Sequence, residues 1–163
     1  MTELKLRRRN RLRRKEVESL AAELNSTMGT ETFQATDAVE TGEAGGNQLV
    51  TYKGKPVGIF INEKPFLTVH GLLMFGAARK HVTVDMGAVK YLANGADVMA
   101  PGIIDADPEI KEGDAVWVRD QNNLRPLLVG IALMDGPGMV AGKGGKAVKT
   151  VHYVGDKIWN LPV

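Results

Sequence analysis

The spacing of apolar residues changes along the chain, and each kind of spacing predicts a different element. Four apolar residues near the beginning follow the order i, i+3, i+4, i+7: Val17, Leu20, Ala21 and Leu24. This order places them on one face of an α-helix, so it predicts an amphipathic helix over residues 11–24. Asn25 and Ser26 follow and Gly29 comes soon after, and these residues are typical of a helix end.

The next part of the chain shows the short apolar runs and turn residues of a β-sheet. Residues 49–52 and 57–61 have the pattern of two strands, and the sequence Lys53-Gly54-Lys55-Pro56 between them predicts a hairpin turn. Residues 33–39 are a further candidate strand, whereas the Gly-rich acidic segment 40–47 is expected to be a loop. The first 78 residues therefore predict a small α+β domain with one long helix against a sheet.

Beyond residues 76–80, the expected domain boundary, β-branched residues and turn signals recur at short intervals. Val82 and Val84 predict a half-buried strand, and Asp85 can cap a short helix. The apolar face expected for that helix is Met86, Val89, Tyr91 and Leu92, and further short strands are expected at residues 98–100, 116–118, 127–132, 147–154 and 158–159. Such strands favour a closed barrel over a layered α/β fold. We therefore expect an α+β protein with two domains, residues 1–78 and a β-barrel over residues 79–163.

The composition excludes several classes of function. Apolar residues make up 44% and charged residues 25% of the 163 residues, so a folded protein is expected. Cysteine is absent, which removes disulfides, thiol catalysis and cysteine-bound zinc. No apolar run approaches the ~20 residues that cross a bilayer, and no secretory signal begins the chain. We therefore expect a cytoplasmic protein without a membrane partner.

Positive charge is concentrated at the beginning of the chain. Residues 1–16 hold eight Lys or Arg and two Glu, whereas the remaining residues hold 13 basic and 17 acidic side chains. The arginines of this basic arm are Arg7, Arg8, Arg9, Arg11, Arg13 and Arg14. Guanidinium groups this close together repel one another unless an anion neutralises them, which favours contact with nucleic-acid phosphates. A solvated helix end, balanced by nearby glutamates, is the alternative.

No group of residues resembles a catalytic centre, and no cofactor or metal is expected. The three histidines (His70, His81 and His152) are far apart and show no metal-ligand spacing. The Gly-rich run 136–146 lacks the GxxxxGK[ST] order of a Walker loop. With Lys143 and Lys146 this run can instead bring main-chain amides and two charges to an RNA backbone, or it can be a long hairpin connection.

Four segments of the second half together resemble the PUA domain, a small β-barrel named after pseudouridine synthases and archaeosine transglycosylases. They are residues 83–104, 112–116, 128–132 and 151–156. The basic first helix, the hairpin 49–61 and residues 65–73 are in turn similar to the pre-PUA domain of one particular family. Nearly the whole chain thus resembles the malignant-T-cell-amplified and translation-machinery-associated proteins and their stand-alone archaeal relatives.

The resemblance implies a groove for RNA beside the short helix of the barrel. Carried over by position, the groove would involve Gly87, Ala88, Lys90 and Tyr91 of the helix, Met99, Ala100, Pro101 and Gly102 at a strand end, and Lys146, Lys149 and His152 of a late strand. The family further implies a non-enzymatic RNA-binding protein that acts in translation. Its expected partners are structured tRNA or rRNA, and either the small ribosomal subunit or an initiation-factor-like protein.

Two other functions stay open on the sequence alone. The chain can be the RNA-targeting accessory subunit of an enzyme that modifies tRNA or rRNA, such as a transglycosylase or a pseudouridine synthase. It can also be a protein-interaction module whose basic arm docks on an acidic partner. Co-purification separates the three functions. An accessory subunit should purify with a modification enzyme, and a protein-interaction module should purify in a nuclease-resistant complex. A translation protein should purify with ribosomal subunits.

Overall fold

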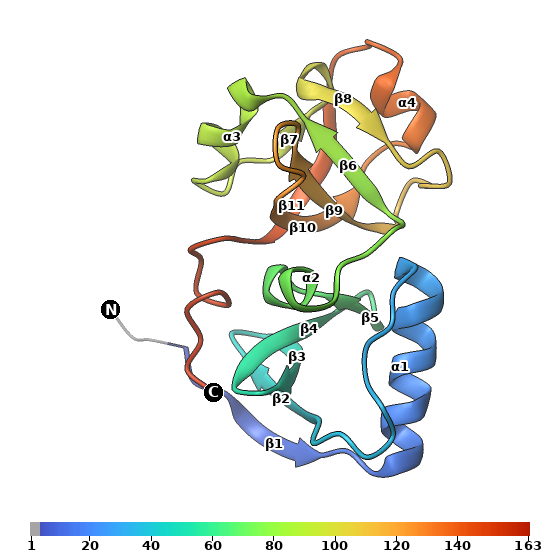
Figure 1. Cartoon of the computed structure of the whole chain (residues 1–163). Helices are drawn as coiled ribbons and strands as arrows, with labels where there is room; N and C mark the ends of the chain where they lie inside the picture. The colour runs from blue at the N-terminus through green and yellow to red at the C-terminus, as the bar shows by residue number, and fades with distance from the viewer. Residues whose placement is uncertain (1–3) are drawn as a thin grey trace. The chain divides into compact units, whose positions relative to one another are not determined.

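The structure, a computed structural model, describes residues 4–163, and these form two compact units (Figure 1). The first unit holds the described residues up to Ala78 together with Lys157–Val163, and the second holds Arg79–Asp156. The division expected from the sequence put residues 157–163 in the second domain, with a strand at residues 158–159. That segment instead forms turns, and the Trp159 ring stacks on the His70 ring with 3.8 Å between the centroids. The chain therefore returns to its first unit at its end.

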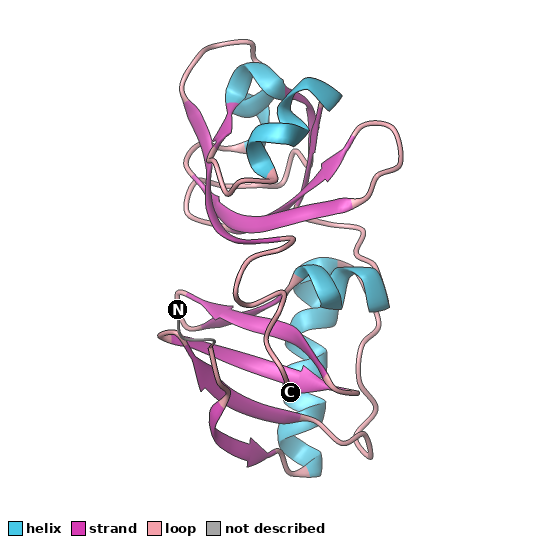
Figure 2. Cartoon of the chain, turned by 90° about the vertical axis from the view of Figure 1, so that its left-hand side faces the viewer, coloured by secondary structure: helices cyan, strands magenta, loops and turns pink. Residues whose placement is uncertain are grey.

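A five-stranded antiparallel sheet in the order β1-β2-β3-β4-β5 forms the first unit with two helices. Its elements are β1 (Arg7–Arg11), α1 (Arg14–Met28), β2 (Glu40–Ala44), β3 (Asn47–Tyr52), β4 (Lys55–Ile61), β5 (Lys64–Leu67) and α2 (Val69–Phe75). Helix α1 lies along one face of the sheet (Figure 2). It buries the predicted stripe of Val17, Leu20, Ala21 and Leu24, which confirms the apolar face read from the sequence.

The basic arm differs from the prediction, because four of its six arginines lie in a strand and the helix, expected from residue 11, begins later. Arg7–Arg11 form β1, which pairs with β2 at the edge of the sheet, and α1 begins only at Arg14. Arg13 between them has an extended backbone, and its N–H donates to Glu16 Oε1 at 2.8 Å. Pairing with β2 therefore sets the conformation of a segment that has no apolar alternation of its own.

The segment 40–47, expected as a loop, supplies β2 and the turn that leads into β3. Gly45 and Gly46 form this turn with φ of 57° and 81°, a backbone that favours glycine. Residues 33–39, the candidate strand, contain none. The predicted hairpin of β3 and β4 is confirmed, and Lys53 and Gly54 form its two-residue turn.

Six strands in the order β7-β11-β10-β9-β6-β8 form the second unit, with only the β6–β9 pair parallel. Its elements are β6 (His81–Val84), α3 (Met86–Leu92), β7 (Val98–Met99), the 3₁₀ turn η1 (Ala100–Gly102), β8 (Ile103–Ala106), β9 (Ala115–Asp120), β10 (Pro126–Ala132), α4 (Gly136–Val140) and β11 (Lys146–Tyr153). The two edge strands, β7 and β8, are separated in the chain by the 3 residues of η1. The sheet therefore has to curl until its edges approach, which confirms the predicted barrel-like fold.

Three local predictions in this unit meet different outcomes. Asp85 caps α3 as predicted, because its Oδ1 accepts the Ala88 N–H at 3.1 Å. The expected apolar face of α3 is confirmed only at Leu92, which is buried, and is wrong at Met86 and Tyr91, which are exposed. The Gly-rich run also differs from the expected loop, because residues 136–140 form α4. Its cap is Asp135, whose Oδ1 accepts the Gly138 N–H at 2.7 Å.

No helix among the described residues has both the length and the apolar character that a membrane crossing requires. Over the same part of the chain, no three His, Cys, Asp or Glu side chains come together as a candidate metal site.

Candidate nucleic-acid interface

A groove of about 590 Å³ lies beside α3 in the second unit. Helix α3 forms one wall, and the strand β7, the turn η1 and the first residue of β11 supply the rest. Its lining residues are Asp85, Ala88, Tyr91, Leu92, Ala96, Asp97, Val98, Met99, Pro101, Gly102 and Lys146. Its volume falls in the range of small-ligand sites in proteins. The groove is therefore large enough to admit part of an RNA chain.

Apolar side chains in the groove are exposed to an unusual degree. Tyr91 is 60% exposed and Met99 is 48% exposed, whereas Leu92 and Val98, which also line the groove, are buried. Lys90 Nζ lies 5.1 Å from the centroid of the Tyr91 ring, which is a cation–π distance. Exposed aromatic faces next to positive charge are the surfaces on which unpaired bases stack in single-strand binding proteins.

A charged rim borders the groove at the start of β11. Lys146 Nζ lies 3.3 Å from Asp97 Oδ2, and Asp97 Oδ1 accepts the Thr150 N–H at 3.0 Å. The hydrogen bond from Thr150 lowers the pKa of the Asp97 carboxyl; desolvation opposes this, and the charges of Lys146 and Lys149 lower it further. Asp97 therefore stays ionised and holds Lys146 at the mouth of the groove, where an RNA phosphate can approach it.

Gly102 keeps the groove open between the helix and the strand end. A Cβ at this position would lie 3.4 Å from the Ala88 Cβ, so any larger side chain would extend into the groove. The Gly102 carbonyl accepts the Asp85 N–H at 2.9 Å, which fixes η1 against the beginning of α3. The local backbone thus sets the width of the groove.

The structure brings together six of the candidate residues from the sequence and leaves others outside the groove. The six that line it are Ala88, Tyr91, Met99, Pro101, Gly102 and Lys146. Gly87, Lys90 and Lys149 are exposed on α3 and β11 without lining it, and Lys143 lies in the open segment 141–145. Sequence reasoning missed Asp97, because its pairing with Lys146 depends on the β7–β11 register and not on any local motif.

Two of the candidate residues cannot present side chains to RNA, and both expectations are corrected. Ala100 is 2% exposed and His152 is fully buried. His152 Nδ1 lies 3.0 Å from both Asp156 carboxylate oxygens, and Asp156 Oδ2 also accepts the Tyr153 N–H at 3.0 Å. The sequence did not reveal the burial of His152, because that burial comes from tertiary packing and no local pattern marks it.

Replacing His152 with alanine is expected to reduce stability and to leave RNA affinity within twofold. The substitution removes a buried hydrogen-bonded pair, so the free energy of unfolding should fall by about 2 kcal/mol. Urea unfolding measures this loss, with Lys149→Ala, an exposed position on the same strand, as control. Unchanged stability together with lost RNA binding would show that His152 contacts the RNA after all.

The basic arm places its arginines along an exposed strand of the first unit. All five residues of β1 are exposed. Arg9 Nη2 pairs with Glu40 Oε2 at 2.9 Å, and Arg8 Nη1 lies 3.4 Å from Glu43 Oε2. Arg13 and Arg14 follow at the beginning of α1. An exposed strand spaces alternate side chains by about 6.7 Å, so this row can follow a chain of phosphates.

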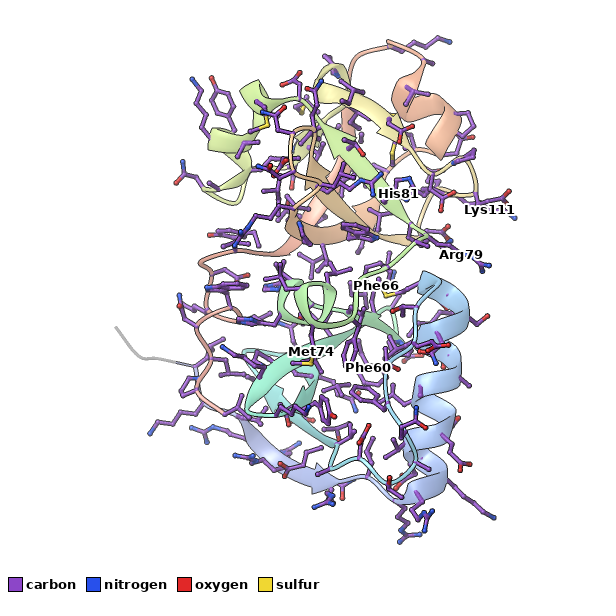
Figure 3. The ribbon with its side chains drawn as sticks, in the orientation of Figure 1. Phe60, Phe66, Met74, Arg79, His81 and Lys111 are labelled. Atoms are coloured by element: carbon purple, nitrogen blue, oxygen red, sulfur yellow. The ribbon has the colours of Figure 1, made fainter. Side chains whose placement is uncertain are left out.

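Other basic residues of the second unit lie apart from the groove. Figure 3 shows Arg79 and Lys111 on the side of this unit away from α3. Lys80 Nζ, from the same region, pairs with Asp114 Oδ2 at 2.8 Å. Lys111 is exposed and therefore serves as a matched control for charge changes at the groove.

Comparisons of the chain with known proteins agree with this geometry. A family model of the PUA domain matches residues 80–154, which contain the whole groove. The chain is 41% identical over 160 residues to an uncharacterized protein of Methanocaldococcus jannaschii, which covers 97% of this chain and 99% of that protein. It is 30% identical over 95 residues to translation machinery-associated protein 20 of Saccharomyces cerevisiae, covering 55% of this chain and 52% of the yeast protein. It is also 25% identical over 118 residues to malignant T-cell-amplified sequence 1 of Danio rerio, covering 70% of this chain and 65% of the fish protein.

Solved structures show the same fold over nearly the full chain. A hypothetical protein of Pyrococcus horikoshii matches with a TM-score of 0.81 and 37% identity, covering 93% of this chain and 98% of that one. A conserved PUA domain protein from Thermoplasma acidophilum matches with a TM-score of 0.80 and 27% identity, covering 93% and 97%. The fold and the groove thus define a PUA protein, and PUA is an RNA-binding domain. The chain belongs to the PUA family that includes translation machinery-associated protein 20 and malignant T-cell-amplified sequence 1, which confirms the resemblance found in the sequence.

Proposed function

We propose that this chain is a non-enzymatic RNA-binding protein of the cytoplasmic translation apparatus that contacts the small ribosomal subunit or a tRNA. The observation that carries the proposal is the groove, where the exposed Tyr91 and Met99 adjoin Lys146 within the segment matched by the PUA model. The name of the yeast relative supports the extension to translation, because that protein is called translation machinery-associated.

The two basic features would have different tasks in RNA binding. The arginines of β1 would contact phosphates, which gives affinity that depends on salt and little on sequence. The groove would accept an unpaired base or a helix end, and shape would decide which RNA fits. The arginines would thus supply most of the affinity for RNA, and the groove would supply the selectivity among RNAs.

The carboxylates of the groove support a binding role over a catalytic one. Asp85 is engaged in capping α3, and Asp97 is engaged by Thr150 and Lys146. Both carboxylates thus have structural partners that fix the helix cap and the groove rim, which fits a groove that holds RNA.

Crosslinking in cells, followed by sequencing of the attached RNA, tests the proposal. The expected result is enrichment of small-subunit rRNA or tRNA over mRNA, and nuclease-sensitive sedimentation of the chain with small ribosomal subunits. Co-purification with a tRNA- or rRNA-modifying enzyme, without ribosomal subunits, would move the assignment to an accessory subunit of that enzyme. Association that resists nuclease would argue for a protein partner and against the proposal.

A further inference from the structure

A second cavity, also of about 590 Å³, lies in the first unit between the basic arm and the β2–β3 turn. Three basic residues line it, Lys5, Arg7 and Arg8, together with the single acidic residue Glu43. The turn glycines Gly45 and Gly46 form another part of its lining, and a Cβ on Gly46 would meet no atom within 4 Å. The cavity is therefore cationic and open on the side of the turn.

A β-bulge explains how two neighbouring arginines face the same cavity. In a regular strand successive side chains point to opposite faces. In β1 the register shifts between the pairs Arg7–Glu43 and Asn10–Thr41, and Arg8 has a φ of 52°. A non-glycine residue in this backbone region is strained, and such strain is found at functional sites. The bulge redirects Arg8 so that it lines the cavity beside Arg7.

Lys5 is held at the cavity by its two neighbours. A Cβ on Gly42 would lie 2.6 Å from the Leu6 Cδ1, and a Cβ on Gly45 would lie 3.0 Å from a Leu4 methyl carbon. Leu4 and Leu6 therefore pack closely on glycine positions of the β2–β3 hairpin. This packing fixes the backbone of Lys5 between them and keeps its charge near Arg7 and Arg8.

The charges in this cavity do not balance internally. Three cationic side chains face one carboxylate, and the only ion pair among them is long, with 3.4 Å between Arg8 Nη1 and Glu43 Oε2. Those two side chains are 81% and 53% exposed, so water screens their attraction. Charges and bulges also protect edge strands from pairing with other chains. Edge protection explains why β1 is charged, but it does not explain why the charges converge on one cavity.

We propose that this cavity binds a phosphate monoester, and that its source is the 5′-terminal phosphate of an RNA. The excess of two positive charges matches a monoester, which carries about −1.5 to −2 at neutral pH, whereas an internal phosphodiester carries a single charge. Guanidinium groups bind phosphate oxygens through paired hydrogen bonds, which suits Arg7 and Arg8. The assignment to an RNA end rests on the proposed function, while the phosphate site itself does not.

Two measurements on the full chain test this inference. The first compares one oligonucleotide with a 5′-phosphate and with a 5′-hydroxyl by fluorescence anisotropy, and about tenfold tighter binding of the phosphorylated form is expected. The double substitution Arg7→Gln with Arg8→Gln should abolish this preference. Arg11→Gln with Arg14→Gln removes the same charge from the same arm outside the cavity, and should keep the preference.

The second measurement adds adenosine 5′-monophosphate or adenosine and follows the backbone amides of Gly45, Gly46 and Asn47 by NMR. The nucleotide should shift these amides and the nucleoside should not. Absence of a shift overturns the phosphate site. A shift without any preference for the phosphorylated oligonucleotide overturns the assignment to an RNA end. If neither oligonucleotide binds, the proposed function fails, and the nucleotide titration still decides whether the cavity takes a phosphate.

Discussion

Removing the Tyr91 ring together with the Lys146 charge is expected to lower the affinity for structured RNA by about 100-fold. Stacking of a base on an aromatic side chain contributes about 1–3 kcal/mol, and a charged hydrogen bond to phosphate adds a similar amount. Tyr91 is 60% exposed and Lys146 is exposed, so the double variant Tyr91→Ala with Lys146→Gln should fold normally. Filter binding or anisotropy with a tRNA measures the change.

Two further variants show whether the loss belongs to the groove. Lys111→Gln removes the same charge as Lys146→Gln on the side of the barrel away from α3, and should change affinity by less than twofold. Gly102→Leu leaves every charge in place and extends a side chain into the groove, because its Cβ lies 3.4 Å from that of Ala88. This variant should reproduce most of the loss. Normal binding by Gly102→Leu would mean that RNA does not enter the groove.

Neutralising the arginine row of β1 is expected to reduce both RNA affinity and its dependence on salt. With Arg7, Arg9 and Arg11 replaced by glutamine, the slope of log K against log salt should become shallower by about 2, because each lost contact to a single strand removes about 0.7. At low salt the affinity should fall by about 100-fold, while the preference for structured RNA over heparin should persist, since the groove is intact.

A matched control for this triple variant lies elsewhere on the same sheet. Lys53, Lys55 and Lys64 are exposed on the β3–β4 turn, β4 and β5, and their replacement by glutamine removes the same net charge. This control should retain most of the salt dependence of the natural chain. If the slope of log K against log salt became equally shallow in both triple variants, overall charge would matter and the basic arm would have no special role.

The sequence revealed those parts of the fold where local patterns and tertiary packing agree. The stripe from Val17 to Leu24 predicted α1, β-branched runs predicted β6, β9 and β10, and Asp85 marked the beginning of α3. The apolar residues of these patterns also enter the core, and Asp85 has its partner within the same helix, the Ala88 N–H. The closed barrel followed from the number of short strands and the turns between them.

The parts that escaped prediction depend on tertiary packing and on strand pairing, which local sequence patterns do not show. Strand β1 consists of exposed polar residues, and it exists because β2 pairs with it and Leu4 and Leu6 pack on the β2–β3 hairpin. His152 is buried because a tertiary fold covers it and Asp156 bonds it. The groove was predicted only in outline for the same reason, since Asp97 meets Lys146 through strand pairing.

The central claim is that RNA enters the groove beside α3, and photo-crosslinking followed by mass spectrometry tests it most directly. The purified chain is irradiated with a bound tRNA or small-subunit rRNA fragment, and the crosslinked peptides are mapped. The account predicts that RNA adducts concentrate on Tyr91, Met99 and the peptide around Lys146, which line the groove. Adducts confined to the region of Arg79 and Lys111, with none in residues 85–102, would contradict it.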